Sequence, residues 1–389
     1  MIKFIRLANF LSFGENQEAV ELRPLNIVIG ANGCGKSNFL EAFDLLRNAP
    51  KDIKLPIREG GGVLEWLYKD AAGNDKQRVA ALETTIDTSV DKNVRYELLF
   101  TAMGTRFEII GEQMINAQTQ DGQKSSFSLE GPVQELTNIF GDSSIEVLSD
   151  EQCRQVSMLS EISDKKMYPE IVALSHAFNH IHLYRDWVFG RNSACRQLQN
   201  ADMPCEYLAF DCSNLALVLN QMNHHIPAKR RLLTELQNFY ADVEDYFVSA
   251  IGNYVQIYFQ ERGRNKPIPA SRLSDGTLRY LCLLAILCNP NPPPLVCIEE
   301  PELGLHPDII PGLARLMTEA SEKCQLIVTT HSDILIDAFT ENPEAILVAE
   351  KIDGETQIKR LNSEQLAPWL AEYRLGSLWL RGDIGGTRW

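Results

Sequence analysis

Eight consecutive residues near the start of the chain have the composition of a phosphate-binding loop. Gly30–Ser37 reads GANGCGKS and fits the pattern G-x-x-x-x-G-K-S. In such a loop the backbone N–H groups surround phosphate oxygens, and glycine is needed because a Cβ atom would block that approach. Lys36 would reach the β- and γ-phosphates of ATP, and the Ser37 hydroxyl would bind Mg²⁺. The alternative, a glycine-rich turn without function, is disfavoured because a strand and a helix are expected on either side.

A pair of carboxylates follows an apolar segment late in the chain. Leu295–Ile298 is a short apolar run, and Glu299 and Glu300 come directly after it. A strand here would carry both carboxylates to the carboxyl edge of a sheet, where ligands bind in open α/β folds. One carboxylate would then hold the metal shell, and the other would orient and deprotonate a water molecule. Such a pair is often only a solvated turn, so its weight comes from its occurrence together with the phosphate-binding loop.

Two other polar segments lie at expected element ends. The sequence Ser-Asp-Gly-Thr at 274–277 precedes an apolar helix, and Ser274 is a natural N-cap for it. Capping statistics favour this structural role, while the sharper interpretation is that Ser274, Gly276 and the helix N-terminus grip a γ-phosphate. His331 follows the apolar run Leu326–Thr330. A lone histidine at a strand end is usually structural, but one beside a γ-phosphate would hydrogen-bond it.

Hydrophobic periodicity predicts the elements that position these residues. Apolar residues alternate with polar ones up to Ile29, and a helical pattern follows over Lys36–Asn48. Farther on, the patterns predict a surface excursion at 51–75, an antiparallel meander over 77–130 and mostly helix from about 133 to 250. Within that helical region, Leu233, Leu236, Phe239 and Val243 have helical spacing. The last part of the chain is predicted to contain a strand at Tyr254–Gln260, a buried helix at 278–288, an amphipathic helix from Ile309 to Ala320 and a strand at Leu326–Thr330. Strands and helices that alternate over short links indicate a parallel sheet.

The same patterns suggest a division of the chain. We expect an N-terminal ATP-binding lobe with an antiparallel β-subdomain at 1–150, a helical lobe at 151–260, and a C-terminal lobe at 261–389. Residues 1–50 and 261–389 are expected to form one core. No heptad run is long enough to predict a coiled-coil arm.

Composition restricts the class of protein. The 389 residues are 44% apolar, an ordinary value for a globular protein with a substantial core. Nine cysteines, none in a C-x-x-C pair, argue against a disulfide scaffold and for reduced thiols in the cytoplasm. We expect no signal peptide, because no basic leader precedes an apolar block. No apolar stretch approaches the roughly 18 residues of a membrane span, so no membrane partner is expected.

The formal net charge of −15 disfavours binding to nucleic acid through the chain as a whole. Lys229-Arg230-Arg231 and the group Arg262, Arg264 and Lys266 are local basic patches, although charge runs are more often solvated surface. His176, His180 and His182 are close enough in sequence to suggest a metal site. They lack an evident third acidic or cysteine ligand, so a structural or surface role is favoured.

The order of the motifs resembles that of the ABC-type ATPases: phosphate-binding loop, signature, Walker B acid and switch histidine. The run Glu300–Pro307 (EPELGLHP) and the opening Ile2–Phe13 (IKFIRLANFLSF) are similar to the RecF/SMC/OLD branch, in particular its small stand-alone AAA-like "predicted ATPases". Asp211–Leu215 and Gly376–Asp383 also resemble segments of those proteins. The likeness covers both ends of the chain well and residues 50–210 poorly.

The resemblance implies an α/β fold of the P-loop NTPase class, an ABC-type ATPase head. Its parts would be a mixed or parallel core sheet, an antiparallel β-subdomain and a helical lobe, without a long coiled-coil arm. It also implies roles by position. The catalytic residues would be Glu300 as base, His331 as switch histidine and Lys36; the metal ligands would be Ser37 and Glu299; and the nucleotide-binding residues would be Gly30, Ala31, Asn32, Gly33, Cys34, Gly35, Lys36, Ser37, Asn38, Ser274 and Gly276.

The resemblance further implies the assembly. In this family the signature of one subunit completes the ATP site of another, so an ATP-dependent homodimer or higher oligomer is expected. Leu303–His306 would be its D-loop. The implied partners are DNA or another nucleic acid, or a nuclease or toxin effector, often in anti-phage defence.

Three positions depart from the family pattern. Glu299 stands where Asp is commoner, which lengthens the arm to the metal. Asp275 in the signature would place a negative charge near phosphate, and only Gln155 is a candidate for the Q-loop glutamine. We therefore expect slow hydrolysis. A nucleotide-gated scaffold or inhibitor with little turnover is the alternative function, and a transporter motor is a third, disfavoured by the EPELGLHP run.

Overall fold

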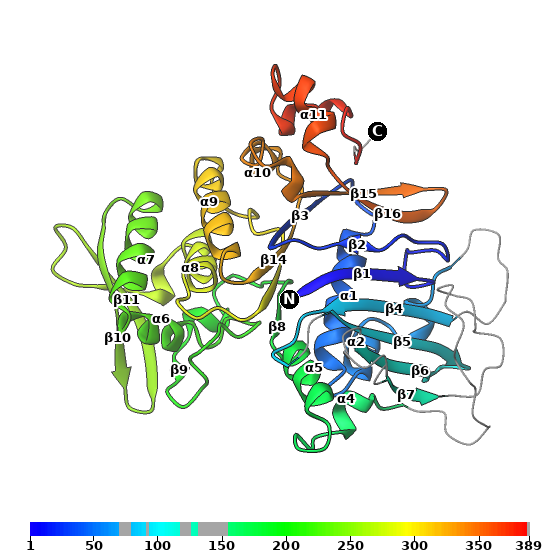
Figure 1. The fold of residues 1–389 in the computed structure, drawn as a ribbon. Coiled ribbons are helices and arrows are strands. Elements are labelled where there is room, and N and C mark those ends of the chain that lie inside the picture. Colours follow the sequence, from blue (N-terminus) through cyan, green and yellow to red (C-terminus); the bar gives the residue numbers. More distant parts are fainter. Residues whose placement is uncertain (70–78, 91–92, 117–125, 131–154, 387–389) are drawn as a thin grey trace. The chain divides into compact units, whose positions relative to one another are not determined.

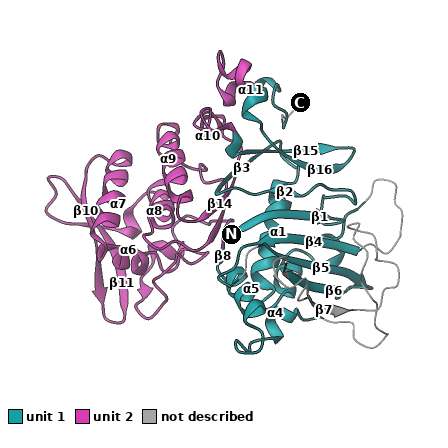
Figure 2. Ribbon diagram, in the orientation of Figure 1, with its two compact units in different colours: residues 1–181, 344–366, 381–389 teal, residues 182–343, 367–380 magenta. Residues whose placement is uncertain are grey.

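The computed structural model describes residues 1–69, 79–90, 93–116, 126–130 and 155–386 (Figure 1). The chain forms two compact units (Figure 2). The first unit contains Met1–Ile181, Glu344–Leu366 and Arg381–Trp389, and the second contains His182–Pro343 and Ala367–Leu380. Helices α11 (Ser363–Leu370) and α12 (Leu375–Arg381) each cross a limit between the two units.

An antiparallel sheet makes up much of the first unit. Its strand order is β2-β1-β4-β5-β6-β7. The strands are β1 (Ile2–Ala8), β2 (Val20–Glu21), β4 (Val79–Ile86), β5 (Val94–Met103), β6 (Arg106–Asn116) and β7 (Ser126–Glu130). Each neighbouring pair runs antiparallel. The antiparallel meander predicted over 77–130 is therefore confirmed for the residues that the structure describes.

Aromatic side chains cover this sheet. Tyr96 on β5 packs edge-on against Phe178 of α5 (Pro169–Asn179), with ring centroids 5.3 Å apart. Phe10, which follows β1, contacts both Trp66 and Phe100 in edge-on geometry. Because large rings bury much apolar area and interlock in this geometry, these contacts stabilise the sheet from the side that carries the helices.

The surface excursion predicted at 51–75 is wrong for its first part. The segment forms two short helices, α2 (Lys54–Glu59) and α3 (Val63–Trp66), and Trp66 is only 1% exposed. The glycine-rich sequence at 60–62 separates the helices instead of marking a loose loop. Residues 70–75 lie outside the described residues.

The phosphate-binding sequence lies in the first unit between a strand and a helix. Strand β3 (Leu25–Ile29) is buried throughout, and α1 runs over Lys36–Asn48, as predicted. Strand β15 (Ile346–Ile352) pairs in parallel with β3 and antiparallel with β16 (Glu355–Arg360). The apolar face of α1 buries Phe39, Leu40, Phe43 and Leu46, the residues whose spacing predicts the helix.

The second unit contains a helical part and a hairpin. Its helices are α6 (Leu215–Asn223), α7 (Ile226–Phe239), α8 (Asp275–Leu287), α9 (Ile310–Ser321) and α10 (Asp333–Asp337). Strand β10 (Val243–Ile251) pairs antiparallel with β11 (Tyr254–Glu261), which also pairs with β9 (Gln199–Asn200) and β12 (Ile268–Pro269). Phe239 of α7 stacks on Tyr280 of α8 with 4.7 Å between the ring centroids. The buried helix predicted at 278–288 is thus confirmed as α8.

The prediction of mostly helix from about 133 to 250 is only partly right. Residues 133–154 lie outside the described residues, α4 (Met158–Glu161) is a single turn, and β8 (Ile181–Tyr184) and β10 are strands. Val243 fits the helical spacing that precedes it, yet α7 ends at Phe239. Eight residue pairs align β10 with β11, from Val243 opposite Glu261 to Ile251 opposite Tyr254. Tertiary pairing therefore overrides the local period.

Two parallel strands of the second unit carry the predicted carboxyl-end residues. Strand β13 (Leu295–Glu299) pairs with β14 (Gln325–Thr330), with Glu299 opposite Thr329. Helix α9 connects them and buries the predicted apolar stripe. Among the described residues, no helix is long and apolar enough to cross a membrane.

Candidate functional site

The phosphate-binding loop has a geometry suited to an anion. It connects β3 to α1, and α1 begins at Lys36 with no acidic residue in its first turn and no side chain capping its N-terminus. The first N–H groups of a helix and its dipole together favour negative charge at this end. The loop therefore has the backbone arrangement by which helix N-termini bind phosphate.

Two glycines of the loop are required by close approach. A Cβ on Gly35, which has φ 104°, would lie 2.1 Å from the Thr356 hydroxyl oxygen. A Cβ on Gly30 would lie 2.3 Å from the carbonyl oxygen of Ala349 on β15. Neither distance is compatible with a side chain, so the glycine pattern follows from packing of β15 and β16 against the loop.

Lys36 places its ammonium group within the loop. Its Nζ donates to the carbonyl oxygens of Gly30 and Ala31, each at 2.9 Å, and lies 3.8 Å from the sulfur of Cys34. The residue is 6% exposed. The positive charge is therefore held at the centre of the loop, whereas Asn32, Gly33 and Ser37 are exposed at its surface.

A hydrogen-bonded clamp holds the base of the loop. The Thr356 hydroxyl donates to the Cys34 carbonyl at 2.8 Å and shares a hydrogen bond with the Ser12 hydroxyl at 2.6 Å. The Asn38 amide donates to the same Ser12 oxygen at 2.8 Å. Asn38, predicted to bind nucleotide, thus has a structural contact in this arrangement. Ser12 lies in the opening run Ile2–Phe13 that carries the family resemblance, but the sequence assigned no role to it, and Thr356 lies in no motif.

The predicted base and switch histidine lie together in the second unit. Glu300 follows β13, His331 follows β14, and Nε2 of His331 is 3.4 Å from Oε1 of Glu300. Both side chains are partly buried, at 29% exposure for Glu300 and 19% for His331. Because β13 and β14 are adjacent parallel strands, their carboxyl ends place the two side chains at one edge.

Glu300 has an unusual backbone conformation. Its φ is 44°, in the left-handed region that residues other than glycine rarely adopt, and its N–H donates to the Thr329 carbonyl at 3.0 Å. Arg279 of α8 lies within 3.4 Å of the Glu300 carbonyl oxygen. Such conformations persist where surrounding contacts hold them, and they cluster at functional sites.

Glu302 is a third acid at this edge that the sequence analysis did not single out. Its Oε1 accepts hydrogen bonds from the Thr330 hydroxyl and from the backbone N–H of His331, the latter at 3.1 Å. Burial raises the pKa of the Glu302 carboxyl, and the two hydrogen bonds act in the opposite direction. Glu302 therefore fixes the start of the His331 segment. The signal that the sequence offers is its place in the Glu300–Pro307 run, two residues after Glu300.

Ser274 is the N-cap of α8, as predicted. Its hydroxyl accepts from the Thr277 N–H at 3.0 Å and pairs with the Thr277 hydroxyl at 2.7 Å. Gly276 faces the turn that follows Glu300, since a Cβ there would lie 3.0 Å from the carbonyl oxygen of Gly304. The signature segment and the predicted D-loop therefore approach each other closely within the second unit.

Arg196 contacts Asp275 of the signature segment and the backbone that precedes the segment. Its guanidinium pairs with the Asp275 carboxylate and donates to the Leu273 carbonyl at 2.5 Å, with longer contacts of 3.4 Å to the carbonyls of Ala270 and Ser271. Arg196 is 8% exposed. The negative charge of Asp275, which the sequence places near phosphate, is thus balanced by a buried arginine.

Oxygen donors suited to Mg²⁺ are present at both predicted metal ligands. Ser37 supplies a hydroxyl at the start of α1, and Glu299 supplies a partly exposed carboxylate at the end of β13. Mg²⁺ prefers such hard oxygen ligands, so both residues fit the metal by donor chemistry. Ser37 belongs to the first unit and Glu299 to the second.

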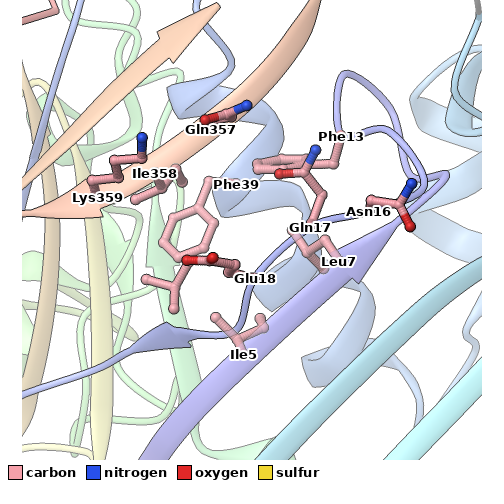
Figure 3. Close-up of a pocket in the computed structure, with 11 residues that line it drawn as sticks. Ile5, Leu7, Phe13, Asn16, Gln17, Glu18, Phe39, Gln357, Ile358 and Lys359 are labelled. Atoms are coloured by element: carbon pink, nitrogen blue, oxygen red, sulfur yellow. The ribbon is translucent and has the colours of Figure 1, made fainter. Parts of the chain in front are cut away.

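A cavity of about 170 Å³ lies beside α1 in the first unit (Figure 3). Figure 3 shows the ring of Phe39 between the β16 residues 357–359 and side chains from β1 and the segment after it, including Gln17 and Glu18. No residue of the phosphate-binding loop lines this cavity. It is therefore separate from the loop, although its wall shares α1.

Several of the remaining sequence candidates have side-chain partners. Lys229 pairs with Asp245 at 3.2 Å, Arg231 pairs with Glu319, and Arg264 pairs with Glu261. These pairs partly neutralise both basic patches. Gln155 hydrogen-bonds Lys54 and Glu108 at 3.4 and 3.3 Å.

The histidine group packs through its rings. His176 and His180 stack with 4.1 Å between centroids, and His182 contacts Tyr207 edge-on at 4.8 Å. Within the described part of the chain, no three His, Cys, Asp or Glu residues are grouped to hold a metal ion.

Comparison with known proteins agrees with this architecture. Residues 25–337 match the model of a family described as "AAA domain, putative AbiEii toxin, Type IV TA system". The fold is similar to an SMC head solved with the C-terminal winged-helix domain of ScpA (TM-score 0.56, 13% identity, covering 94% of this chain and 99% of that one). It is also similar to the SMC head with an extended coiled coil bound to the C-terminal domain of ScpA from Pyrococcus furiosus (TM-score 0.53, 12% identity, 95% and 98%). The predicted fold class, an ABC-type ATPase head of the RecF/SMC/OLD branch, is confirmed.

Proposed function

This chain belongs to the AAA-domain family of putative AbiEii toxins of type IV toxin–antitoxin systems, and from this premise we propose that it is a cytoplasmic ATPase that dimerises on ATP and controls a partner. Membership of the family makes it a nucleotide-binding ATPase by class. Hydrolysis, dimerisation and the control of a partner are the steps that the proposal adds.

The pair Glu300–His331 is the observation that carries the proposed hydrolysis. The Glu300 backbone has φ 44°, and the Glu300 carboxylate lies 3.4 Å from the His331 ring. Glu302 holds the backbone N–H of His331, which keeps that histidine beside Glu300. A general base must be positioned before its pKa matters. In the proposal, Glu300 accepts a proton from the attacking water, and His331 hydrogen-bonds the γ-phosphate while it orients the Glu300 carboxylate.

The phosphate-binding loop has the binding role in this proposal. The backbone N–H groups of Gly30–Ser37 would surround the phosphates, and Lys36 would exchange its bonds to the Gly30 and Ala31 carbonyls for phosphate oxygens. Asn38 would contribute indirectly, because its hydrogen bond to Ser12 holds the first turn of α1 in place. Ser37 and Glu299 would hold Mg²⁺, which would neutralise charge on the phosphates.

The exposed signature segment supports a dimer. Ser274 and Asp275 are exposed at the N-terminus of α8, a helix of 13 residues, and Arg196 holds the segment in place from behind. In the proposal, Ser274 and Gly276 of one copy contact the γ-phosphate bound to another. The pairing of Asp275 with Arg196 reduces the repulsion that a free carboxylate would exert there.

The partner in this proposal is a protein effector of the nuclease or toxin class. The family description names a toxin of a toxin–antitoxin system, and both similar SMC heads were solved with a bound domain of ScpA. A role in anti-phage defence is consistent with such an effector. The acidic net charge and the paired basic patches favour a protein over a nucleic acid.

Glu300→Gln tests the proposal. The amide cannot accept the proton, so ATP turnover should fall by about 10²–10⁴-fold while ATP binding and the ATP-dependent dimer persist. Phosphate release, nucleotide titration and light scattering measure these three quantities. Glu322→Gln, at an exposed position after α9, is the matched control and should leave all of them unchanged.

Unchanged phosphate release in Glu300→Gln would refute the assigned base. Lys36→Ala separates binding from chemistry, because it should remove ATP binding itself. If the unaltered chain binds ATP and forms the dimer without turnover, the scaffold function is correct instead; Glu299, with its longer arm to the metal, is the residue that favours that outcome.

A further inference from the structure

Three cysteines from distant segments meet in the second unit, and none of them is a residue assigned to ATP. Cys195 lies in the 3₁₀ turn Ala194–Arg196, Cys212 precedes α6, and Cys282 lies in α8. Cys282 is in side-chain hydrogen-bonding contact with both Cys195 and Cys212. All three are thiols. Since the described residues contain no group arranged to hold a metal ion, the cluster points to sulfur chemistry rather than metal binding.

Cys195 has the environment of a reactive thiol. The Ser193 hydroxyl lies 3.5 Å from its sulfur, and the next residue in the chain is the positively charged Arg196. The hydrogen bond from Cys282 is the largest cause that lowers the pKa of Cys195, to about 7, with smaller contributions from Ser193 and Arg196 against the effect of burial. Burial instead raises the pKa of Cys282 well above its ordinary value. One thiol is thus poised to ionise, and its neighbour keeps a proton to donate.

A cavity gives small molecules a route to this cluster. It has a volume of about 410 Å³, and its wall includes Cys195, Cys212, Trp187 and Phe210. Cys195 itself is only 2% exposed, so access depends on this cavity and not on the outer surface. Thiolate character and access together determine which cysteines of a protein are oxidised.

We propose that Cys195 is a redox-modification site, where a peroxide oxidises the thiol to a sulfenic acid and Cys282 then forms a disulfide with it. In the first step the Cys195 thiolate attacks one peroxide oxygen, the O–O bond breaks, and the departing oxygen leaves as water after taking a proton. In the second step the Cys282 sulfur attacks the Cys195 sulfur, the S–O bond breaks, and a second water leaves with the Cys282 proton.

The disulfide would connect the 3₁₀ turn to α8. Arg196 in that turn holds the Leu273 carbonyl and Asp275 at the start of the same helix. The modification would therefore fix the position of the signature segment from the side opposite its exposed face. The proposal does not depend on ATP hydrolysis, so its test is independent of the proposed function.

The first experiment measures native alkylation of the full chain by iodoacetamide near pH 7, with each cysteine followed by peptide mapping. Cys324 is the internal control, because it is 3% exposed and burial raises its pKa to about 11. Cys195 should be alkylated at least about tenfold faster than Cys324. Equal or slower labelling of Cys195 would overturn the proposal, and this measurement requires no variant.

The second experiment treats the full chain with hydrogen peroxide and maps peptides without reduction. A linked pair of peptides containing Cys195 and Cys282, lighter by two hydrogens than the separate thiols, is expected. Cys282→Ser should stop the reaction at a sulfenic acid on Cys195, trapped by dimedone, whereas Cys324→Ser should form the disulfide as the unaltered chain does. A Cys212–Cys282 disulfide with unmodified Cys195, or no oxidation of Cys195, would contradict the assignment.

Discussion

Replacing Arg196 with methionine should loosen the signature segment, while replacing its acidic partner Asp275 with asparagine should change it little. Methionine keeps most of the buried stem and removes the guanidinium. The guanidinium donates at 2.5 Å to the Leu273 carbonyl and pairs with Asp275, and Arg196 is 8% exposed whereas the Asp275 side chain is 55% exposed. The two variants therefore separate the buried backbone contact from the exposed ion pair.

The expected magnitude follows from these contacts. A hydrogen bond from a charged donor contributes about 1.5–3 kcal/mol, and its loss leaves a carbonyl without that donor. An ion pair with an exposed partner contributes about 0–1 kcal/mol. The contacts to Ala270 and Ser271, at 3.4 Å, are too long to add much. We therefore expect Arg196→Met to cost the segment about 2–4 kcal/mol and Asp275→Asn about 1 kcal/mol or less.

Hydrogen exchange measures this locally. The chain has two units, so its global unfolding need not be one transition, and the amides of Leu273, Thr277 and Leu278 are better probes. They donate to Ala270, to Ser274 Oγ and to the Ser274 carbonyl respectively. Since each 1.4 kcal/mol is about tenfold, protection should fall about 30-fold or more in Arg196→Met and about fivefold or less in Asp275→Asn.

Two outcomes would refute the reasoning. Equal losses in both variants would mean that the ion pair, not the contact with the Leu273 carbonyl, holds the segment. Unchanged protection in Arg196→Met would mean that Ser274 capping alone is sufficient. Amides of β4, which lies in the other unit, should keep their protection in both variants and serve as the control.

Two more predictions concern the loop and the buried acid. Gly35→Ala should weaken ATP binding at least about tenfold in nucleotide titrations, because its Cβ would lie 2.1 Å from the Thr356 hydroxyl. The control Gly33→Ala should weaken binding less, since its Cβ meets no atom within 4 Å and the change brings only about 1–2 kcal/mol of backbone strain. Equal losses of ATP affinity in the two variants would contradict this reasoning. The pKa of Glu302 is raised in the folded state above its ordinary value of 4.5. Its protonated form therefore stabilises the fold fully below pH 4.5, and this stabilisation is lost as the pH rises through the folded-state pKa. Glu302→Gln lacks this loss, so the free energy of local opening at β14, measured by hydrogen exchange and taken relative to the unaltered chain, should increase from pH 4.5 to neutrality. A constant difference across this range would contradict the assignment.

Motifs with local spacing could be predicted from the sequence, and so could the elements beside them. The helix Lys36–Asn48 and strands β13 and β14 have the expected positions, because apolar period and end residues are properties of a few neighbouring residues. Capping by Ser274 is also confirmed.

The wrong predictions concern segments whose secondary structure depends on contacts with residues distant in the sequence. Val243 continues a helical spacing but belongs to a strand, because β11 supplies hydrogen-bonding partners along its whole length. The segment after residue 51 forms helices, because Trp66 finds a buried position against Phe10. Neither partner is visible from the local pattern.

The sequence by itself therefore determined the chemical groups of this protein and the order in which they occur: the loop with Lys36, the acids Glu299 and Glu300, and His331. Only the tertiary structure decided their surroundings. It pairs Arg196 with Asp275, which lies 79 residues farther along the chain, and it bonds the backbone N–H of His331 to the Glu302 carboxylate. The physical reason is that spacing along a chain specifies local geometry, whereas burial and charge pairing depend on residues that only folding brings into contact.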